Sequence, residues 1–311
     1  MKKRVRRISA IVLCLVTAMS ACLAVGTDGG TAYAASEVKP YIAFGASLKD
    51  SEKKTVMKLL DVTEDTLADY EVIEVTNEEE HQYLDDYIAS SVIGTRALSS
   101  VKIEENGNED GIRVTTKNIN FCTEAMYVNA LATAGFTNAD VTVAGPFELS
   151  GTAALVGAIK AYSTMQGEDV DDDTMDAAVD ELVTTGDLVE SVGSEKAAQL
   201  MAVIKDAVVK DNLSSDEDIM KAIEDGADKV GVTLSDEEKQ KIMELMKKIG
   251  SLDLDIGALE RSAQSIYDML SNSGIDLGEA GGWFSKIFSS IGDFFAGIGN
   301  AIEDFFKGIF G

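Results

Sequence analysis

Short apolar runs alternate with amphipathic stretches along residues 35–165, a pattern typical of a sheet with helices packed on it. Residues 41–44 are all apolar and are followed by a glycine, so they predict a buried strand. A helix that begins near Ser51 and a strand over 70–75 follow. Asn77 precedes three glutamates, and a capping side chain before negative charge predicts another helix start.

The next part of the chain predicts a hairpin and a crossover. Residues 99–105 and 112–117 alternate apolar and polar side chains on either side of a polar loop, which predicts a hairpin. Strand 112–116, helix 122–134 and strand 141–144 then predict one crossover between parallel strands. The fold class is therefore α+β or α/β, with an N-terminal mixed sheet domain and packed helices over residues 35–165.

Beyond residue 165 the pattern changes to acidic amphipathic helices. Ser215 and Ser235 each precede an Asp-Glu pair, which predicts two capped helix starts. We expect a small antiparallel helical bundle over residues 166–278. Apolar positions recur at three- and four-residue spacing in the five expected helices, Met175–Val183, Glu195–Val209, Asp216–Lys229, Asp236–Ile249 and Ile256–Leu270.

The last segment, residues 279–311, predicts a strongly amphipathic helix. Gly292, Gly297, Gly299 and Gly308 each cost about 1 kcal/mol relative to alanine, so the helix should form only against an apolar surface. The protein's own body, another copy of the chain and a membrane interface all fit this requirement. The residues expected to contact a membrane or partner are Trp283, Phe284, Ile287, Phe288, Ile291, Phe294, Phe295, Ile298, Ile302, Phe305, Phe306 and Ile309.

Residues 1–34 predict a secretory signal peptide. Five basic residues precede an apolar run, and Ala32-Tyr33-Ala34 matches the small-x-small site of signal peptidase. A lipoprotein signal is the alternative, because Met19–Cys22 loosely resembles a lipobox. The apolar run continues after Cys22, which favours secretory cleavage over lipidation. We therefore expect a secreted or extracytoplasmic protein, associated with a membrane or cell wall if its last segment attaches it.

Charge excludes one class of partner. Cleavage after residue 34 leaves 22 basic and 53 acidic side chains, a formal net charge of −31. Such a surface repels phosphate backbones, so nucleic-acid binding is excluded. The simplest role of the acidity is the solubility of an exported protein.

The chain has too few cysteines and histidines for disulfides or for a zinc site. Cys122 is the one cysteine outside residues 1–34, so no intramolecular disulfide is expected. It lies on an apolar helix, which favours a buried structural thiol over a catalytic dyad with His81. Because His81 is the one histidine, a histidine-rich zinc site is excluded by count. No metal, cofactor or catalytic residue is assigned.

Three further sequence patterns could form a binding or catalytic site, but each also has a simpler explanation that requires no function. Ser150, Gly151 and Thr152 follow a strand and open a helix, where backbone amides can hold an anion, but a plain strand-to-helix turn with Ser150 as N-cap is favoured. Ser51 and Lys54 have the serine-x-x-lysine spacing of some acyl enzymes without the accompanying motifs. The aspartates at 169, 171, 172 and 173 fit a calcium site or, more simply, a solvated linker.

Several separated motifs resemble one exported family. They are Phe44–Leu48, Val75–Glu79, Ser99-Ser100, Asn118-Ile119, Tyr127–Gly135, Pro146 and Ser150–Leu155. This set resembles the YpuA-like family of secreted proteins from Gram-positive bacteria and covers most of residues 40–270. The resemblance implies no activity, because the family carries a domain of unknown function.

These patterns favour a non-enzymatic extracellular or cell-envelope binding protein. Its C-terminal helix would serve membrane contact, binding of a partner protein or self-association. A secreted hydrolase acting from the sheet domain is one alternative, and a membrane-active effector acting through residues 283–311 is another.

Overall fold

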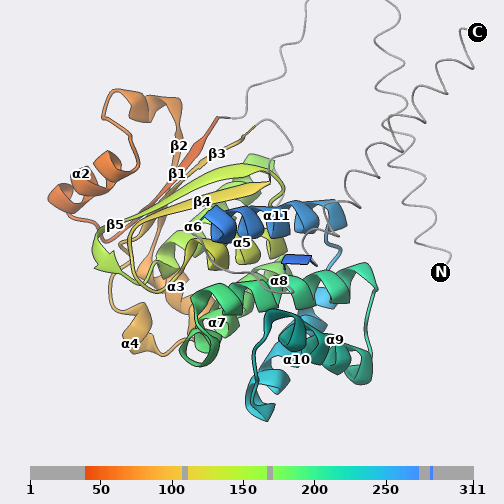
Figure 1. Ribbon diagram of the computed structural model, residues 1–311. Helices are drawn as coiled ribbons and strands as arrows, with labels where there is room; N and C mark the ends of the chain where they lie inside the picture. The colour runs from red at the N-terminus through yellow and green to blue at the C-terminus, as the bar shows by residue number, and fades with distance from the viewer. Residues whose placement is uncertain (1–38, 107–110, 167–170, 273–280, 283–311) are drawn as a thin grey trace, which may run out of the picture. The chain divides into compact units, whose positions relative to one another are not determined.

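The described part of the chain contains a five-stranded mixed sheet followed by a series of helices (Figure 1). The computed structural model describes residues 39–106, 111–166, 171–272 and 281–282. The sheet has the order β2-β1-β3-β5-β4; β1 and β2 are parallel, β4 and β5 are parallel, and β3 is antiparallel to both its neighbours. The strands are β1 Tyr41–Gly45, β2 Glu71–Val75, β3 Ser100–Glu104, β4 Ile112–Ile119 and β5 Ala139–Leu149.

The fold class is α+β, and the helices predicted within the described residues are present, although α7 is longer than the predicted Met175–Val183. Ser215 and Ser235 cap α9 and α10, as predicted, by accepting from the amides of Asp218 and Glu238. Thr76 rather than Asn77 caps α3. The helices are α2 Asp50–Leu59, α3 Asn77–Leu84, α4 Ser90–Ile93, α5 Glu124–Thr133, α6 Thr152–Gln166, α7 Asp172–Val192, α8 Ser194–Lys210, α9 Asp216–Val230, α10 Asp236–Ser251 and α11 Ile256–Asn272, with a 3-10 turn at Thr66–Asp69.

The predicted crossover is present, but the predicted hairpin is wrong. β4, α5 and β5 follow one another, and β4 and β5 pair in parallel. However, β3 pairs with β5, not with β4, so β5 lies between the two strands of the expected hairpin. Val141 and Val143 of β5 are buried between neighbours on both sides, whereas β4 exposes Arg113 and Thr115 and lies at the edge. Because an inner strand buries more apolar area than an edge strand, the more apolar strand takes the inner position.

Helices cover both faces of the sheet (Figure 1). Alternation along β1 sends Ala43 to the face covered by α5 and α6, and Ile42 and Phe44 to the face covered by α2. Gly157 lets α6 approach the sheet, because a Cβ at this position would lie 2.8 Å from the Ala43 Cβ.

The helices after residue 170 contribute to the same core as the sheet. One cluster of buried side chains combines strand and α5 residues with Val179 of α7, Ala198 of α8 and Ile266 of α11. A second cluster joins α7, α8, α9 and α10 to one another. The division into domains near residue 166 stays a prediction, and the structure shows extensive packing across it.

Two predicted segments fall mostly or wholly outside the described residues. The signal peptide at 1–34 is one, and the amphipathic helix at 279–311 is the other, apart from Gly281 and Gly282, which are helical. In the part of the chain that the structure describes, every helix is too short or too polar to cross a lipid bilayer.

A buried ion pair joins the sheet-covering helix α5 to α7 and α8. Lys205 Nζ lies 2.9 Å from Glu181 Oε1, and these side chains are 4% and 0% exposed. The ammonium also donates to the carbonyl of Asn129 (2.9 Å) and to Thr133 Oγ1 (3.2 Å), while the Thr133 hydroxyl donates to Glu181. Burial raises the pKa of Glu181 and lowers that of Lys205, so the mutual attraction and these hydrogen bonds must offset desolvation.

Lys205→Met should lower the free energy of unfolding by about 3–5 kcal/mol, because it leaves the Glu181 carboxylate buried without its cation. Urea denaturation measures this loss. The double variant with Glu181→Leu should recover part of it. Lys241→Met is the matched control, since it breaks an exposed pair with Asp187 and should cost about 0–1 kcal/mol. A loss no larger than that of the control would contradict the assigned role of the pair.

Candidate functional site

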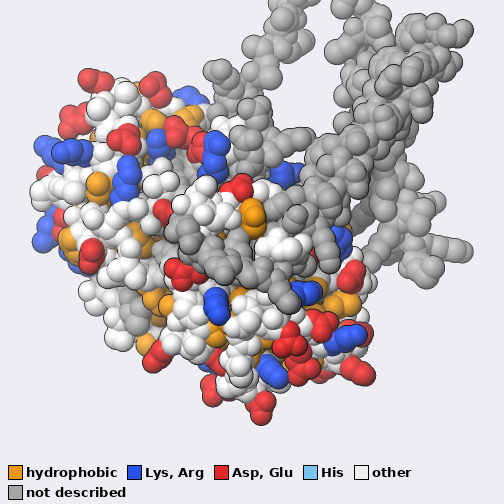
Figure 2. Space-filling model, in the orientation of Figure 1, with side chains coloured by type: hydrophobic (Ala, Val, Ile, Leu, Met, Phe, Trp, Pro, Cys, Tyr) orange, Lys and Arg blue, Asp and Glu red, His pale blue; other side chains and the backbone are white. Residues whose placement is uncertain are grey.

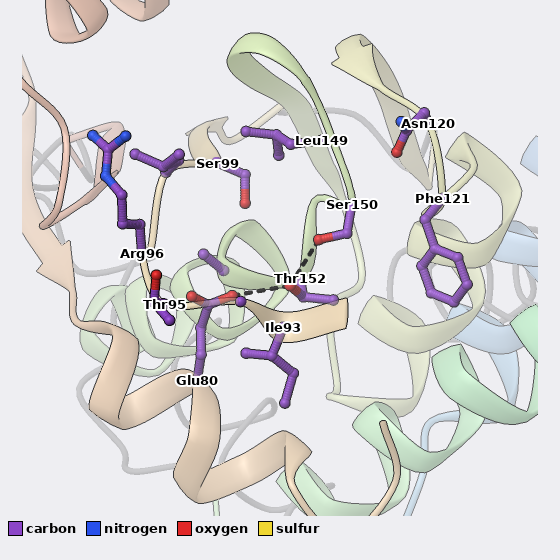
Figure 3. Close-up of a pocket in the computed structure, with 13 residues that line it drawn as sticks. Glu80, Ile93, Thr95, Arg96, Ser99, Asn120, Phe121, Leu149, Ser150 and Thr152 are labelled. Carbon is purple, nitrogen blue, oxygen red and sulfur yellow. Dashed lines mark hydrogen bonds between the residues drawn. The ribbon is translucent and has the colours of Figure 1, made fainter. Parts of the chain in front are cut away.

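A cleft of about 440 Å³ opens at the N-terminus of α6, and we call it the α6 cleft (Figure 3). It is lined by residues of the segments 93–99, 120–121 and 149–153, together with Glu80 of α3. These segments precede β3 or follow β4 and β5. The cleft therefore lies beyond the C-terminal ends of the parallel strands β4 and β5. Ligands of open α/β sheets bind outside this same edge, and the volume suits a small molecule.

A chain of hydrogen bonds crosses the floor of the α6 cleft (Figure 3). Glu80 is 1% exposed, and its Oε1 accepts from the Thr152 hydroxyl at 2.9 Å. Thr152 Oγ1 lies 3.2 Å from Ser150 Oγ, and Asn77 Nδ2 donates to Glu80 Oε2 at 3.3 Å. Burial raises the pKa of Glu80, and the hydrogen bonds from Thr152 and Asn77 oppose that rise only in part.

The start of α6 is capped from a distant part of the chain. Ser99 Oγ accepts from the amide of Ala154 at 2.9 Å, so Ser99, not Ser150, provides the cap. Gly151 has a φ of +97° and its carbonyl accepts from the Tyr127 hydroxyl at 2.6 Å. A Cβ at Gly151 would lie 2.6 Å from that hydroxyl oxygen, so this position requires glycine.

The three residues proposed as a weak anion site therefore have different roles. Ser150 and Thr152 line the α6 cleft, whereas Gly151 is buried against Tyr127 and is not part of the lining. Glu80 brings a carboxyl group to the same helix start, and a carboxylate there opposes a second anion. The arrangement suits hydrogen-bonding groups better than a phosphate.

The two ends of the α6 cleft differ in chemistry. In Figure 3, Arg96 lies at one end and Asn120 with Phe121 at the other. The Arg96 guanidinium donates to the Glu52 carboxylate (2.5 Å) and to the Ser47 carbonyl (2.8 Å), and this pairing lowers the pKa of Glu52. The arginine is therefore held by the protein itself, and its charge is largely neutralised.

A second cleft, of about 330 Å³, opens at the start of α5. We call it the α5 cleft, and it shares Asn120 and Phe121 with the α6 cleft. The rest of its lining is Thr116, Ile119, Cys122, Thr123, Glu124, Ala125, Ser194, Glu195, Met269 and Leu270.

The Cys122–His81 dyad, which the sequence disfavoured, is not formed. Cys122 is 2% exposed, and burial raises the pKa of its thiol to about 12, so it fits the predicted structural thiol. His81 contacts Asp85 Oδ1 at 2.7 Å and the Gly94 carbonyl at 3.0 Å through its two ring nitrogens. The hydrogen bond with Asp85 raises the pKa of His81. Both ring nitrogens are thus occupied by partners other than Cys122.

The remaining patterns have structural roles where the chain is described. Ser51 and Lys54 are both exposed on α2. Asp171 Oδ1 accepts from the amide of Thr174 and caps α7, while residue 169 lies outside the described residues. Among described residues, no group of three or more His, Cys, Asp or Glu side chains is arranged to hold a metal ion.

Most of the α6 cleft was not predicted from sequence. Glu80 is one of three consecutive glutamates, and nothing in the pattern distinguishes it as the buried one. The sequence pattern predicts that Ser99 belongs to a strand and that Phe121 lies between a strand and a helix. Their shared position arises from the strand order, which brings distant loops to one edge.

Comparisons with known proteins identify the family to which this α+β chain belongs. The sequence model of the family described as "Protein of unknown function (DUF1002)" matches residues 44–266. The uncharacterized protein YpuA of Bacillus subtilis (strain 168) is 38% identical over 231 residues, which cover 74% of this chain and 78% of the relative. No solved structure matches the chain. The chain belongs to the DUF1002 family, and the resemblance drawn from its motifs is confirmed.

Thr152→Val should lower the free energy of unfolding by about 1–3 kcal/mol at pH 7.5, because buried Glu80 loses a hydrogen-bond donor. The pKa of Glu80 is raised in the folded state, so the contribution of Glu80 to stability is full below its unfolded pKa and falls as pH rises through the folded pKa.

Losing the donor raises that pKa further, so the cost of Thr152→Val should shrink at pH 4, where Glu80 is protonated. Urea denaturation at both pH values measures the difference. Thr152→Ser, which keeps the hydroxyl, is the control and should retain most of the stability. A cost that is equal at both pH values would count against the Thr152–Glu80 contact as its source.

Proposed function

We propose that this protein is an extracytoplasmic, non-enzymatic binding protein of the bacterial cell envelope, with the α6 cleft as its ligand site. Residues 283–311 attach the protein to a membrane surface, to a partner protein or to a second copy. The signal-peptide pattern at residues 1–34 supports export, and the amphipathic pattern of the last segment supports attachment.

The α6 cleft is the observation that carries this proposal. Its lining combines apolar side chains such as Ile93, Leu98 and Leu149 with a few polar groups fixed by internal hydrogen bonds. Small-molecule sites have this composition, in which apolar walls provide contact area and fixed polar groups provide orientation.

The polar groups favour binding over catalysis. The Ser150 hydroxyl contacts the Thr152 hydroxyl, and the described lining of the α6 cleft contains neither histidine nor lysine. A nucleophilic serine needs an adjacent base within hydrogen-bond reach. Glycoside hydrolysis ordinarily uses two carboxyl groups that flank the bond, and Glu80 is the one carboxyl group in this lining. The geometry gives the hydrolase alternative no specific support.

The surface charge is consistent with a role outside the cell that involves no nucleic acid. Figure 2 shows acidic side chains across the visible face, interspersed with lysines and arginines. Interspersed charge with a net negative sum favours solubility and disfavours polyanionic partners.

Filling the α6 cleft should abolish ligand binding. We expect a soluble fraction of envelope fragments, separated into glycan, peptide and phosphate-containing pools, to raise the Tm of the protein by binding its folded state. The Ser150→Tyr variant places a bulky ring at the half-buried edge of the cleft and should show no shift. Glu148→Tyr, on the exposed end of β5, is the control. If no pool shifts the wild-type Tm, or if Ser150→Tyr shifts equally, the cleft is not the ligand site.

Deleting residues 283–311 should abolish attachment while leaving the fold intact, because the family match ends at residue 266. Liposome flotation and gel filtration of the mature chain, with and without these residues, distinguish membrane contact from self-association. Phe294→Asp with Phe295→Asp, which introduces charge into the apolar stripe, should reproduce the deletion. Unchanged flotation and oligomer size after deletion would refute attachment to a membrane or to a second copy.

A further inference from the structure

Phe121 is fixed between the two clefts. The Asn120 amide donates to the Leu149 carbonyl at 2.9 Å, and the Cys122 amide donates to the Ser150 carbonyl at 3.1 Å. The backbone on both sides of Phe121 is therefore hydrogen-bonded to the end of β5. Its ring lies against α7 at Gly186, where a Cβ would come within 2.8 Å of the ring. An aromatic side chain held in this way offers a rigid, half-buried surface common to both clefts.

Hydrogen-bond acceptors lie on both sides of this ring. Glu80 and Ser99 are in the α6 cleft, and Glu124 and Glu195 are in the α5 cleft. One oxygen of Glu124 accepts from the Thr116 amide at 3.0 Å, which fixes the position of that carboxylate. A carboxylate accepts hydrogen bonds and repels negative charge, so this set matches a ligand that carries many donors.

The cationic groups of the two clefts do not compensate for these carboxyl groups. Arg96 is the one lysine or arginine among the described lining residues of both clefts, and it is paired with Glu52. A phosphate-rich or otherwise anionic polymer would face three carboxyl groups and one neutralised guanidinium. Sugar hydroxyls, in contrast, donate to carboxylates without adding charge, and the apolar face of a sugar ring can pack on an aromatic ring.

We propose, building on the proposed function, that the α6 and α5 clefts together form one site for a neutral linear oligosaccharide, with Phe121 as its central platform. Sugar rings pack on Phe121, and their hydroxyls form hydrogen bonds with the half-buried Ser150 hydroxyl on one side and with the Glu124 carboxylate on the other. Asn120, which is exposed between the clefts, provides an amide that both donates and accepts.

The test is binding of defined oligosaccharides to the full mature chain. Isothermal titration calorimetry uses a β-1,4-linked glucose hexamer and a β-1,4-linked N-acetylglucosamine hexamer as neutral probes. An oligogalacturonate hexamer is the anionic probe, and a lysine-containing hexapeptide is the basic one. We expect at least one neutral probe to bind, and the anionic probe and the peptide to give no heat.

Substitutions then localise the site. Phe121→Leu keeps an apolar side chain against Gly186 but removes the ring, and should weaken binding about tenfold or more. Phe147→Leu is the matched control, because Phe147 is a half-exposed aromatic residue of β5 outside both clefts and should bind as the wild type does. Circular dichroism confirms the fold of each variant, and Ser150→Tyr still tests the site if Phe121→Leu does not fold.

The outcomes separate this inference from the proposed function. If only the peptide or the anionic probe binds, and Ser150→Tyr abolishes that binding, the ligand is not a neutral saccharide. The proposed binding function of the α6 cleft is then still supported. Neutral probes that bind Phe121→Leu as well as wild type overturn the platform role. If neither neutral probe binds, the saccharide inference fails; if in addition no envelope pool shifts the Tm, the proposed function fails with it.

Discussion

The buried ion pair between Lys205 and Glu181 connects α5, which covers the sheet, to α7 and α8. Its partners are on α5, α7 and α8, and its ligating atoms include a backbone carbonyl of α5. Apolar side chains can repack at modest cost when helices shift slightly, whereas a buried charge that loses its partner is strongly destabilising. We therefore regard this cluster as what fixes the register between α5 and the helices beneath it.

The clefts depend on that register. The last turn of α5 carries Thr133, which donates to Glu181. Its N-cap Thr123 and its first residue Glu124 line the α5 cleft, and the hydroxyl of Tyr127 donates to the Gly151 carbonyl beside the α6 cleft. One ten-residue helix thus links the buried ion pair to both clefts. A shift of α5 would therefore move the walls of both clefts together.

Sequence patterns predicted most elements and little of the site. β1, the crossover of β4, α5 and β5, and the caps Ser215 and Ser235 follow from local periodicity and capping chemistry. Ser150 and Thr152 were recognised as a helix start and do line the α6 cleft. Glu80, Ser99 and Phe121 were not recognised, because their roles come from partners more than twenty residues away, such as Thr152 for Glu80 and Ala154 for Ser99.

The sequence by itself indicated which segments form most of the helices and strands, because spacing, caps and breakers act within a few residues, although α7 and β5 are longer than predicted. It also determined the family, which several short motifs indicated and the comparisons confirmed. Only the tertiary structure decided that β5 lies between β3 and β4, that Glu80 is buried beside Thr152, and that Phe121 lines both clefts. Strand order and burial depend on contacts between distant segments, and these contacts are chosen by the total apolar area and the satisfied polar groups of the whole fold.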